Sequence, residues 1–145
     1  LKNNINDLKI KMILGPSTKK NSELSKLVKK YNNSITIVHK VLNMRKEIGD
    51  TKFGFCSGGI TTYEFANMNV PFAIISQYPH QLITSKEWKK LGIGMNLGRL
   101  SNTTPKKIQN IVNNLEKYKK NLKISYNIVD GLGTKRIKKE IIYLK

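Results

Sequence analysis

The sequence is poor in cysteine, in acidic residues and in long apolar stretches. Its single cysteine, Cys56, excludes an internal disulfide and is typical of a reducing cytoplasm. No run approaches the ~20 apolar residues that span a bilayer, so we expect no stable membrane insertion. Residues 1–7 lack the apolar stretch of a secretion signal. These features predict a cytoplasmic location.

Ligands for a metal ion are also scarce. His39 and His80 have no second His or Cys at metal-ligand spacing, which argues against zinc. His39 ends a predicted strand and is interpreted as structural. Cys56 has no paired base and is interpreted as a buried structural thiol. We therefore expect no metal site and no cofactor apart from a bound ligand.

The sequence has 9 acidic and 27 basic residues, which gives a formal charge of +18. Only three of the basic residues are Arg, and the Lys-Lys pairs recur along the whole chain. A nucleic-acid-binding surface more often concentrates Arg and aromatic residues in one patch. The pattern favours solvated helix faces and no specific nucleic-acid partner, with a basic nucleic-acid-binding module without catalysis as the alternative.

Apolar periodicity alternates between strand and helix along the 145 residues. Strands are predicted over 8–14, 34–40, 52–56, 71–76 and 92–98. Helices are predicted over 21–31, 43–49, 60–68, 80–92, 104–118 and 134–144, with a further helical turn or two over 121–129. Strands separated by helices imply crossovers, hence a Rossmann-like α/β fold: an open parallel sheet with helices on both faces.

The strongest candidate site is the segment Ser57–Glu64, "SGGITTYE", between a strand and a helix. In such a sheet, ligands bind beyond the carboxyl ends of the strands. Gly58 and Gly59 let backbone N–H groups approach a phosphate at the helix start. Glu64, one turn later, can accept hydrogen bonds from the diol of a ribose. Hydroxyl donors are predicted from Ser57, Thr61 and Thr62. The alternative is a tight turn with a surface glutamate.

Two other loops follow predicted strands at the same edge. Gly15-Pro16-Ser17-Thr18 follows the first strand, and Ser76–Gln81 follows the fourth. Within the second loop, His80 and Gln81 are predicted polar contacts to a phosphate or a sugar. Trp88 and the tyrosines are interpreted as core or helix-packing residues.

The order of "LGPS", "VLNM", "SGGITTYE", "ISQYPHQ" and "DGLGTKRI" resembles the C-terminal domain of GT-B glycosyltransferase-like proteins. The resemblance is greatest to the PseG-type UDP-sugar hydrolases of pseudaminic acid biosynthesis and to SpsG-type polysaccharide biosynthesis proteins. MurG-type transferases are more distant. It covers about residues 8–143 and implies a UDP-sugar-binding domain of an enzyme of surface polysaccharide biosynthesis.

The resemblance also implies roles for individual residues. Glu64 would hold the ribose, and the backbone of residues 58–61 would meet the diphosphate. Asn43 and Met44 fall where relatives contact uracil through the backbone. His80-Gln81 stands where relatives often carry Asn-Gln, so the sugar is left open. The implied UDP-binding residues are Gly15, Ser17, Asn43, Met44, Ser57, Gly58, Gly59, Ile60, Thr61, Glu64, His80 and Gln81.

In these relatives the catalytic histidine lies in an N-terminal domain, which is absent from this sequence. The start at Leu1 rather than Met suggests a fragment, in which residues 1–7 are a linker remnant and 8–145 the nucleotide-sugar-binding domain. We therefore expect no catalytic residue here and no activity of this chain alone. The missing domain is the expected partner in cis. The parent enzyme could also be a GT-B glycosyltransferase or a UDP-sugar 2-epimerase.

Overall fold

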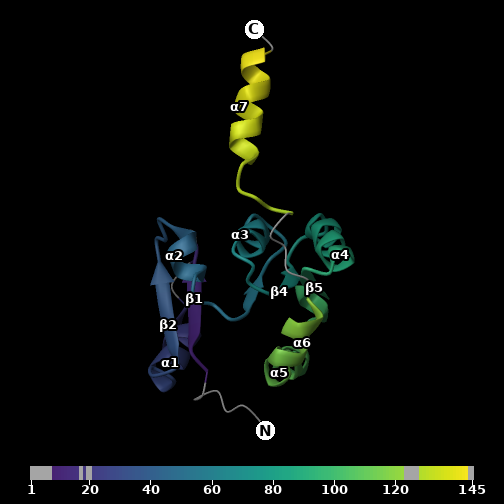
Figure 1. Ribbon diagram of the computed structural model, residues 1–145. Helices are drawn as coiled ribbons and strands as arrows, with labels where there is room; N and C mark the ends of the chain where they lie inside the picture. Colours follow the sequence, from purple (N-terminus) through teal and green to yellow (C-terminus); the bar gives the residue numbers. More distant parts are fainter. Residues whose placement is uncertain (1–7, 17, 19–20, 123–127, 144–145) are drawn as a thin grey trace. The chain divides into compact units, whose positions relative to one another are not determined.

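The structure is a computed structural model that describes residues 8–16, 18, 21–122 and 128–143. The chain divides into two compact units, Leu1–Met44 and Arg45–Lys145. Figure 1 shows the helices and strands of both units. The predicted linker remnant, residues 1–7, lies outside the described residues.

The first unit is built on two parallel strands. β1 (Ile10–Leu14) pairs with β2 (Ile35–His39) in register from Ile10 opposite Ile35 to Leu14 opposite His39. Between them lies α1 (Ser22–Lys30), which begins where the Asn21 side chain accepts a hydrogen bond of 3.1 Å from the Leu24 N–H. This cap satisfies one of the free N–H groups at the helix start.

The second unit holds a three-stranded parallel sheet in the order β3-β4-β5. Its strands are β3 (Gly54–Cys56), β4 (Phe72–Ser76) and β5 (Gly94–Arg99). Its α-helices are α3 (Thr61–Asn67), α4 (Gln81–Leu91), α5 (Pro105–Asn113), α6 (Leu115–Asn121) and α7 (Gly133–Tyr143). The short α2 (Met44–Ile48) spans the boundary between the units, and a 3₁₀ turn covers Leu100–Asn102.

The central strand β4 is buried on both sides because its side chains alternate between two helical layers. Phe72 stacks on Phe65 of α3, with ring centroids 5.8 Å apart, and meets Trp88 of α4 edge-on at 5.7 Å. The next residue, Ala73, belongs to a cluster with Leu97 and Ile111 of α5. Figure 1 shows α3 and α4 on one side of this sheet and α5 and α6 on the other. The strand is therefore held in place between helices.

The predicted fold class is confirmed, because all paired strands are parallel and alternate with helices. Two details differ. The described strands form two separate sheets rather than one. The helix predicted over 104–118 is broken at Asn114, whose side-chain amide donates 2.8 Å to the Asn110 carbonyl and competes with the helical pattern. The further turns predicted over 121–129 fall largely on residues 123–127, outside the described residues.

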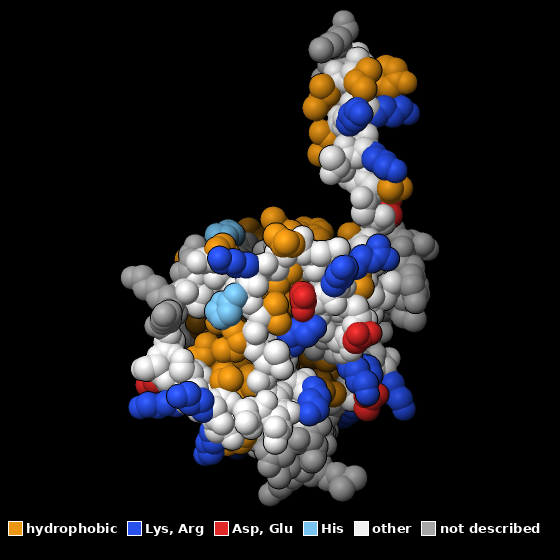
Figure 2. All heavy atoms as spheres, turned by 90° about the vertical axis from the view of Figure 1, so that its left-hand side faces the viewer, with side chains coloured by type: hydrophobic (Ala, Val, Ile, Leu, Met, Phe, Trp, Pro, Cys, Tyr) orange, Lys and Arg blue, Asp and Glu red, His pale blue; other side chains and the backbone are white. Residues whose placement is uncertain are grey.

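Helix α7 has no buried residue. Ile137 and Ile141 are among its exposed side chains, and Figure 2 shows hydrophobic and basic side chains standing out along it. Just before it, Asp130 forms an ion pair with Arg136 and accepts a 2.9 Å hydrogen bond from the Leu132 N–H. No helix in the described part of the chain is long and apolar enough to cross a membrane.

Candidate functional site

The candidate site lies where two neighbouring parallel strands end at the same edge of the sheet. Cys56, the last residue of β3, pairs with Ile74 of β4. The connection from β3 to α3 contains Ser57–Ile60, and together with Thr61, the first residue of α3, we call it the glycine segment. The connection from β4 to α4 contains Gln77–His80. Because the strands run parallel and adjacent, both connections leave the sheet side by side.

Several backbone N–H groups of the glycine segment are free to bind a ligand. Thr62 N donates to Gly59 O at 3.1 Å, and Tyr63 N donates to Ile60 O at 2.9 Å, so the helix itself uses the donors from Thr62 onward. Among the described residues, none accepts a hydrogen bond from the four preceding N–H groups. These belong to Gly58, Gly59, Ile60 and Thr61. Consecutive free N–H groups of this kind suit an anion.

The two glycines of the segment serve different purposes. A Cβ atom on Gly58 would lie 2.8 Å from both the Cβ and the carbonyl oxygen of Gln81, so Gly58 allows the segment to pack against the start of α4. A Cβ atom on Gly59 would meet only the Ser57 hydroxyl, at 3.8 Å. Space for a ligand therefore lies above Gly59.

Of the three predicted hydroxyl donors to a ligand, the prediction for Thr62 is wrong. Its side chain is fully buried, and its hydroxyl donates a 2.8 Å hydrogen bond to Gly59 O, which fixes the turn. Ser57 and Thr61 are partly exposed. These two hydroxyls remain available beside the free N–H groups.

Glu64 is half-buried one turn into α3. Within the described residues its carboxylate makes no ion pair and no hydrogen bond. Burial, reinforced by the negative charge of Glu64, raises the pKa of the Cys56 thiol to about 12. The carboxylate thus lies close to the carboxyl end of β3. A carboxylate without a hydrogen-bond partner among the described residues can accept hydrogen bonds from a ligand that offers hydroxyl donors.

Gln81 holds the connection from β4 to α4 in place through its side chain. Its side chain is buried, and its Oε1 accepts hydrogen bonds from the N–H groups of Gln77, at 2.8 Å, and Tyr78, at 3.4 Å. Since this oxygen is occupied, the side chain holds the connection from β4 to α4 in shape. His80 is exposed and forms no side-chain cap on α4.

The remaining predicted residues lie in the first unit or outside the described residues, so their part in the site stays a prediction. Gly15, Asn43 and Met44 lie in the first unit, with Gly15 and Asn43 exposed, and Ser17 lies outside the described residues. The site described above consists of second-unit residues. They are Ser57, Gly58, Gly59, Ile60, Thr61, Glu64, His80 and Gln81.

One residue beside the site was missed by the sequence interpretation, which placed the tyrosines in the core. Tyr78 is 58% exposed and stacks on His80. Its position between Gln77 and Pro79, outside any apolar periodicity, is the signal that could have identified it.

A separate hollow of about 300 Å³ is mostly apolar and contains no predicted site residue. It is lined by Tyr63, Ile83, Thr84, Glu87, Trp88, Leu91, Ile128 and Val129. In the described part of the chain, no cluster of His, Cys, Asp or Glu could hold a metal ion. Neither observation adds chemistry to the glycine segment.

Comparisons with known proteins support the fold. No family profile and no curated protein matches the chain. Among solved structures, it is similar to the glycosyltransferase of kitacinnamycin, with a TM-score of 0.61 at 14% identity. The match covers 93% of this chain and 43% of that protein, so the chain spans less than half of its length. The chain therefore shares a Rossmann-type α/β fold with that protein.

Proposed function

We propose that the second unit binds the nucleoside diphosphate of a nucleotide sugar, with UDP as the nucleotide. The diphosphate accepts hydrogen bonds from the free N–H groups of residues 58–61, aided by the Ser57 and Thr61 hydroxyls. Glu64 accepts hydrogen bonds from the ribose. The uracil preference rests on the sequence resemblance.

The observation that carries this proposal is the Glu64 carboxylate. It is half-buried one turn after the free donors, and no described residue forms an ion pair or a hydrogen bond with it. A bare phosphate would repel it, whereas a phosphate with an attached diol satisfies both the donors and the acid. Helix α3 has only seven residues, so its dipole is small and the N–H groups carry the attraction.

Calorimetry with UDP and 2′-deoxy-UDP tests the role of Glu64. Hydrogen bonds to a charged group contribute roughly 1.5–3 kcal/mol, so we expect Glu64→Gln to weaken UDP binding by about ten- to a hundredfold. The unaltered chain should prefer UDP over 2′-deoxy-UDP, and this preference should shrink in Glu64→Gln. CDP and GDP, measured alongside, test the uracil preference.

Glu116→Gln is the matched control, because it removes the same charge from an exposed side chain on α6. It should leave UDP binding unchanged. If both substitutions weakened UDP binding equally, Glu64 would act only through its charge and not through a hydrogen bond with the ribose. Absence of UDP binding, together with binding of a short oligonucleotide, would favour the basic nucleic-acid-binding module instead.

For the full-length protein we propose substitution at the bond between sugar and diphosphate, in polysaccharide biosynthesis. The free N–H groups of the glycine segment would then stabilise the charge of the departing diphosphate. Product analysis separates the candidate reactions. Free sugar plus UDP indicates a hydrolase, and a new glycosidic bond indicates a transferase. A UDP-sugar changed at carbon 2 indicates an epimerase.

A further inference from the structure

Tyr78 and His80 form a stacked aromatic pair on the connection between β4 and α4. Their ring centroids are 5.8 Å apart and their planes differ by only 3°. Both side chains are exposed, and Tyr78 exposes 58% of its surface. The pair therefore presents flat aromatic surface to solvent rather than to the core.

The backbone that carries this pair is firmly held. Gln81 Oε1 accepts from the N–H groups of Gln77 and Tyr78, while the Gln81 N–H donates 3.1 Å to Tyr78 O. Pro79 has a ring-restricted φ, and its carbonyl accepts 3.1 Å from Leu82 N. Because this connection is already ordered in the free protein, a ligand that stacks on it loses little binding free energy to ordering the loop.

The connection that carries the aromatic pair leads into Gln81, which packs against the glycine segment. Gly58 lies so close to Gln81 that a Cβ atom would approach to 2.8 Å, and Gln81 directly follows His80. Glu64, by contrast, lies on α3, beyond the other end of the segment. If a diphosphate binds to residues 58–61, Glu64 of α3 follows the Thr61 end of that segment. The connection that carries Tyr78 and His80 lies at its Gly58 end.

We propose that Tyr78 and His80 form a stacking platform for the sugar ring of the nucleotide sugar. This inference rests on the proposed function, because it needs the diphosphate on the glycine segment and the ribose at Glu64. One face of a pyranose ring presents C–H groups, which carry partial positive charge and little polarity. The negative face of an aromatic ring attracts such a surface. The platform thereby selects the part of the substrate that UDP lacks.

The test compares UDP with UDP-glucose and UDP-N-acetylglucosamine by calorimetry. Tyr78→Ala should weaken binding of at least one UDP-sugar by about three- to tenfold, the range of single aromatic contacts, and leave UDP binding unchanged. Tyr78→Phe keeps the ring and should retain sugar binding. Tyr143→Ala, at a tyrosine 74% exposed on α7, is the control and should change neither ligand.

A second measurement uses the unaltered chain. In saturation-transfer NMR with irradiation of the aromatic protons, the sugar-ring protons of bound UDP-glucose or UDP-N-acetylglucosamine should receive saturation. If UDP binds and responds to Glu64→Gln, but neither sugar ring receives saturation and Tyr78→Ala lowers no sugar affinity, the platform is refuted and nucleotide binding stands. If neither UDP nor the UDP-sugars bind, the proposed function fails and the platform fails with it.

Discussion

At the scale of single residues, the adjacent glycines Gly58 and Gly59 have different roles. Gly58 is required for close packing, whereas Gly59 leaves an open surface. Gly58 is buried against Gln81, whereas Gly59 faces space. Neither has a positive φ, since the described glycines that do are Gly92, Gly98 and Gly131. The requirement at Gly58 is therefore for room and not for an unusual backbone.

We predict that Gly58→Ala destabilises the protein by about 1–3 kcal/mol, because the new methyl group meets backbone atoms of Gln81. Gly59→Ala should change the free energy of unfolding by less than about 0.5 kcal/mol, since its methyl group meets nothing closer than Ser57. Urea unfolding of both variants measures the difference. Equal destabilisation would show that both positions are structural and that no ligand surface lies above Gly59.

The sequence was enough to predict the Glu64 carboxylate near the glycine segment, but not the hydrogen bonds that Gln81 and Thr62 make around it. The spacing of Glu64 from the glycines was enough to infer a carboxylate beside the segment. The role of Gln81 depends on a connection folding back on its own helix, and Thr62 turns its hydroxyl to Gly59 O. Such local hydrogen bonds depend on backbone geometry that spacing does not specify.

At the scale of elements, helix starts were easier to predict than helix interiors. Where the helix predicted over 104–118 begins, Thr104 accepts a 3.3 Å hydrogen bond from Lys107 N and Pro105 occupies the first position. The break at Asn114 escaped prediction because the apolar periodicity of Ile108, Ile111 and Leu115 continues across it. Periodicity reports which side is apolar and does not report a local loss of helical backbone.

The start of α7 should respond to acid. Hydrogen bonding to Arg136 and to the Leu132 N–H holds the pKa of Asp130 below its usual value. A carboxyl group with a lowered folded-state pKa stabilises above its unfolded pKa, and that contribution is lost as the pH falls. We predict that the helix start frays as the pH drops below about 4, the usual Asp value, as followed by NMR shifts of residues 132–136.

The variant Asp130→Asn serves as the reference for this effect. All other acidic residues are the same in both proteins, so the difference between them isolates Asp130. The loss on acidification should be smaller in the variant. An identical acid profile would mean that the pair with Arg136 does not hold the helix start in solution.

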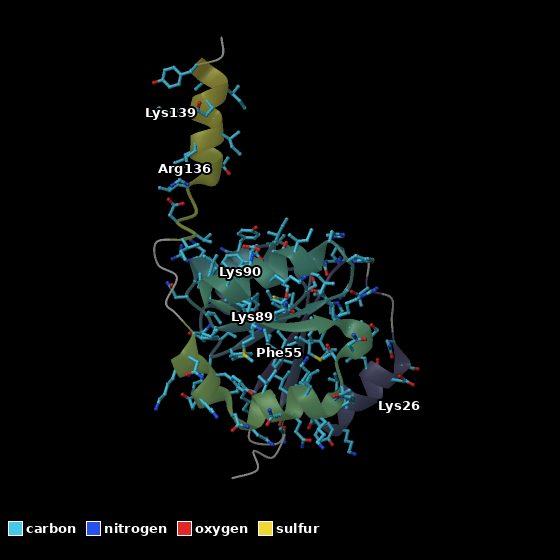
Figure 3. The ribbon with its side chains drawn as sticks, turned by 90° about the vertical axis from the view of Figure 1, so that its right-hand side faces the viewer. Lys26, Phe55, Lys89, Lys90, Arg136 and Lys139 are labelled. Atoms are coloured by element: carbon cyan, nitrogen blue, oxygen red, sulfur yellow. The ribbon has the colours of Figure 1, made fainter. Side chains whose placement is uncertain are left out.

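At the scale of the whole molecule, the charge of +18 is spread over many elements. The basic residues labelled in Figure 3 come from three helices: Lys26 from α1, Lys89 and Lys90 from α4, and Arg136 and Lys139 from α7. Figure 2 likewise shows basic side chains scattered among others on one face. A dispersed charge attracts polyanions without selecting among them.

We therefore predict different salt dependences for two ligands. Binding of a short oligonucleotide should weaken by at least about tenfold between 50 and 200 mM salt, because each phosphate contact releases counterions. UDP has two phosphates and should weaken far less. Glu64→Gln should alter only UDP binding. Fluorescence anisotropy and calorimetry measure the two affinities, and oligonucleotide binding that persists at high salt would indicate a specific nucleic-acid site.

The alternation of strands and helices was sufficient to predict the parallel fold. Parallel neighbours need a crossover, and every strand pair recorded here has one between its members. The division into two units was not predicted, because periodicity identifies each strand but not which edges pair. The free N–H groups also required the structure, since they depend on which donors the helix uses itself.

Cys56 offers a practical advantage for following ligand binding with a reporter group. It is the only cysteine in the sequence, and with a pKa of about 12 it remains protonated near neutral pH. Maleimide dyes and spin labels react with the thiolate form, so this thiol should stay unmodified. A cysteine introduced at an exposed position such as Lys90 would then carry the reporter alone, with no need for a cysteine-free background.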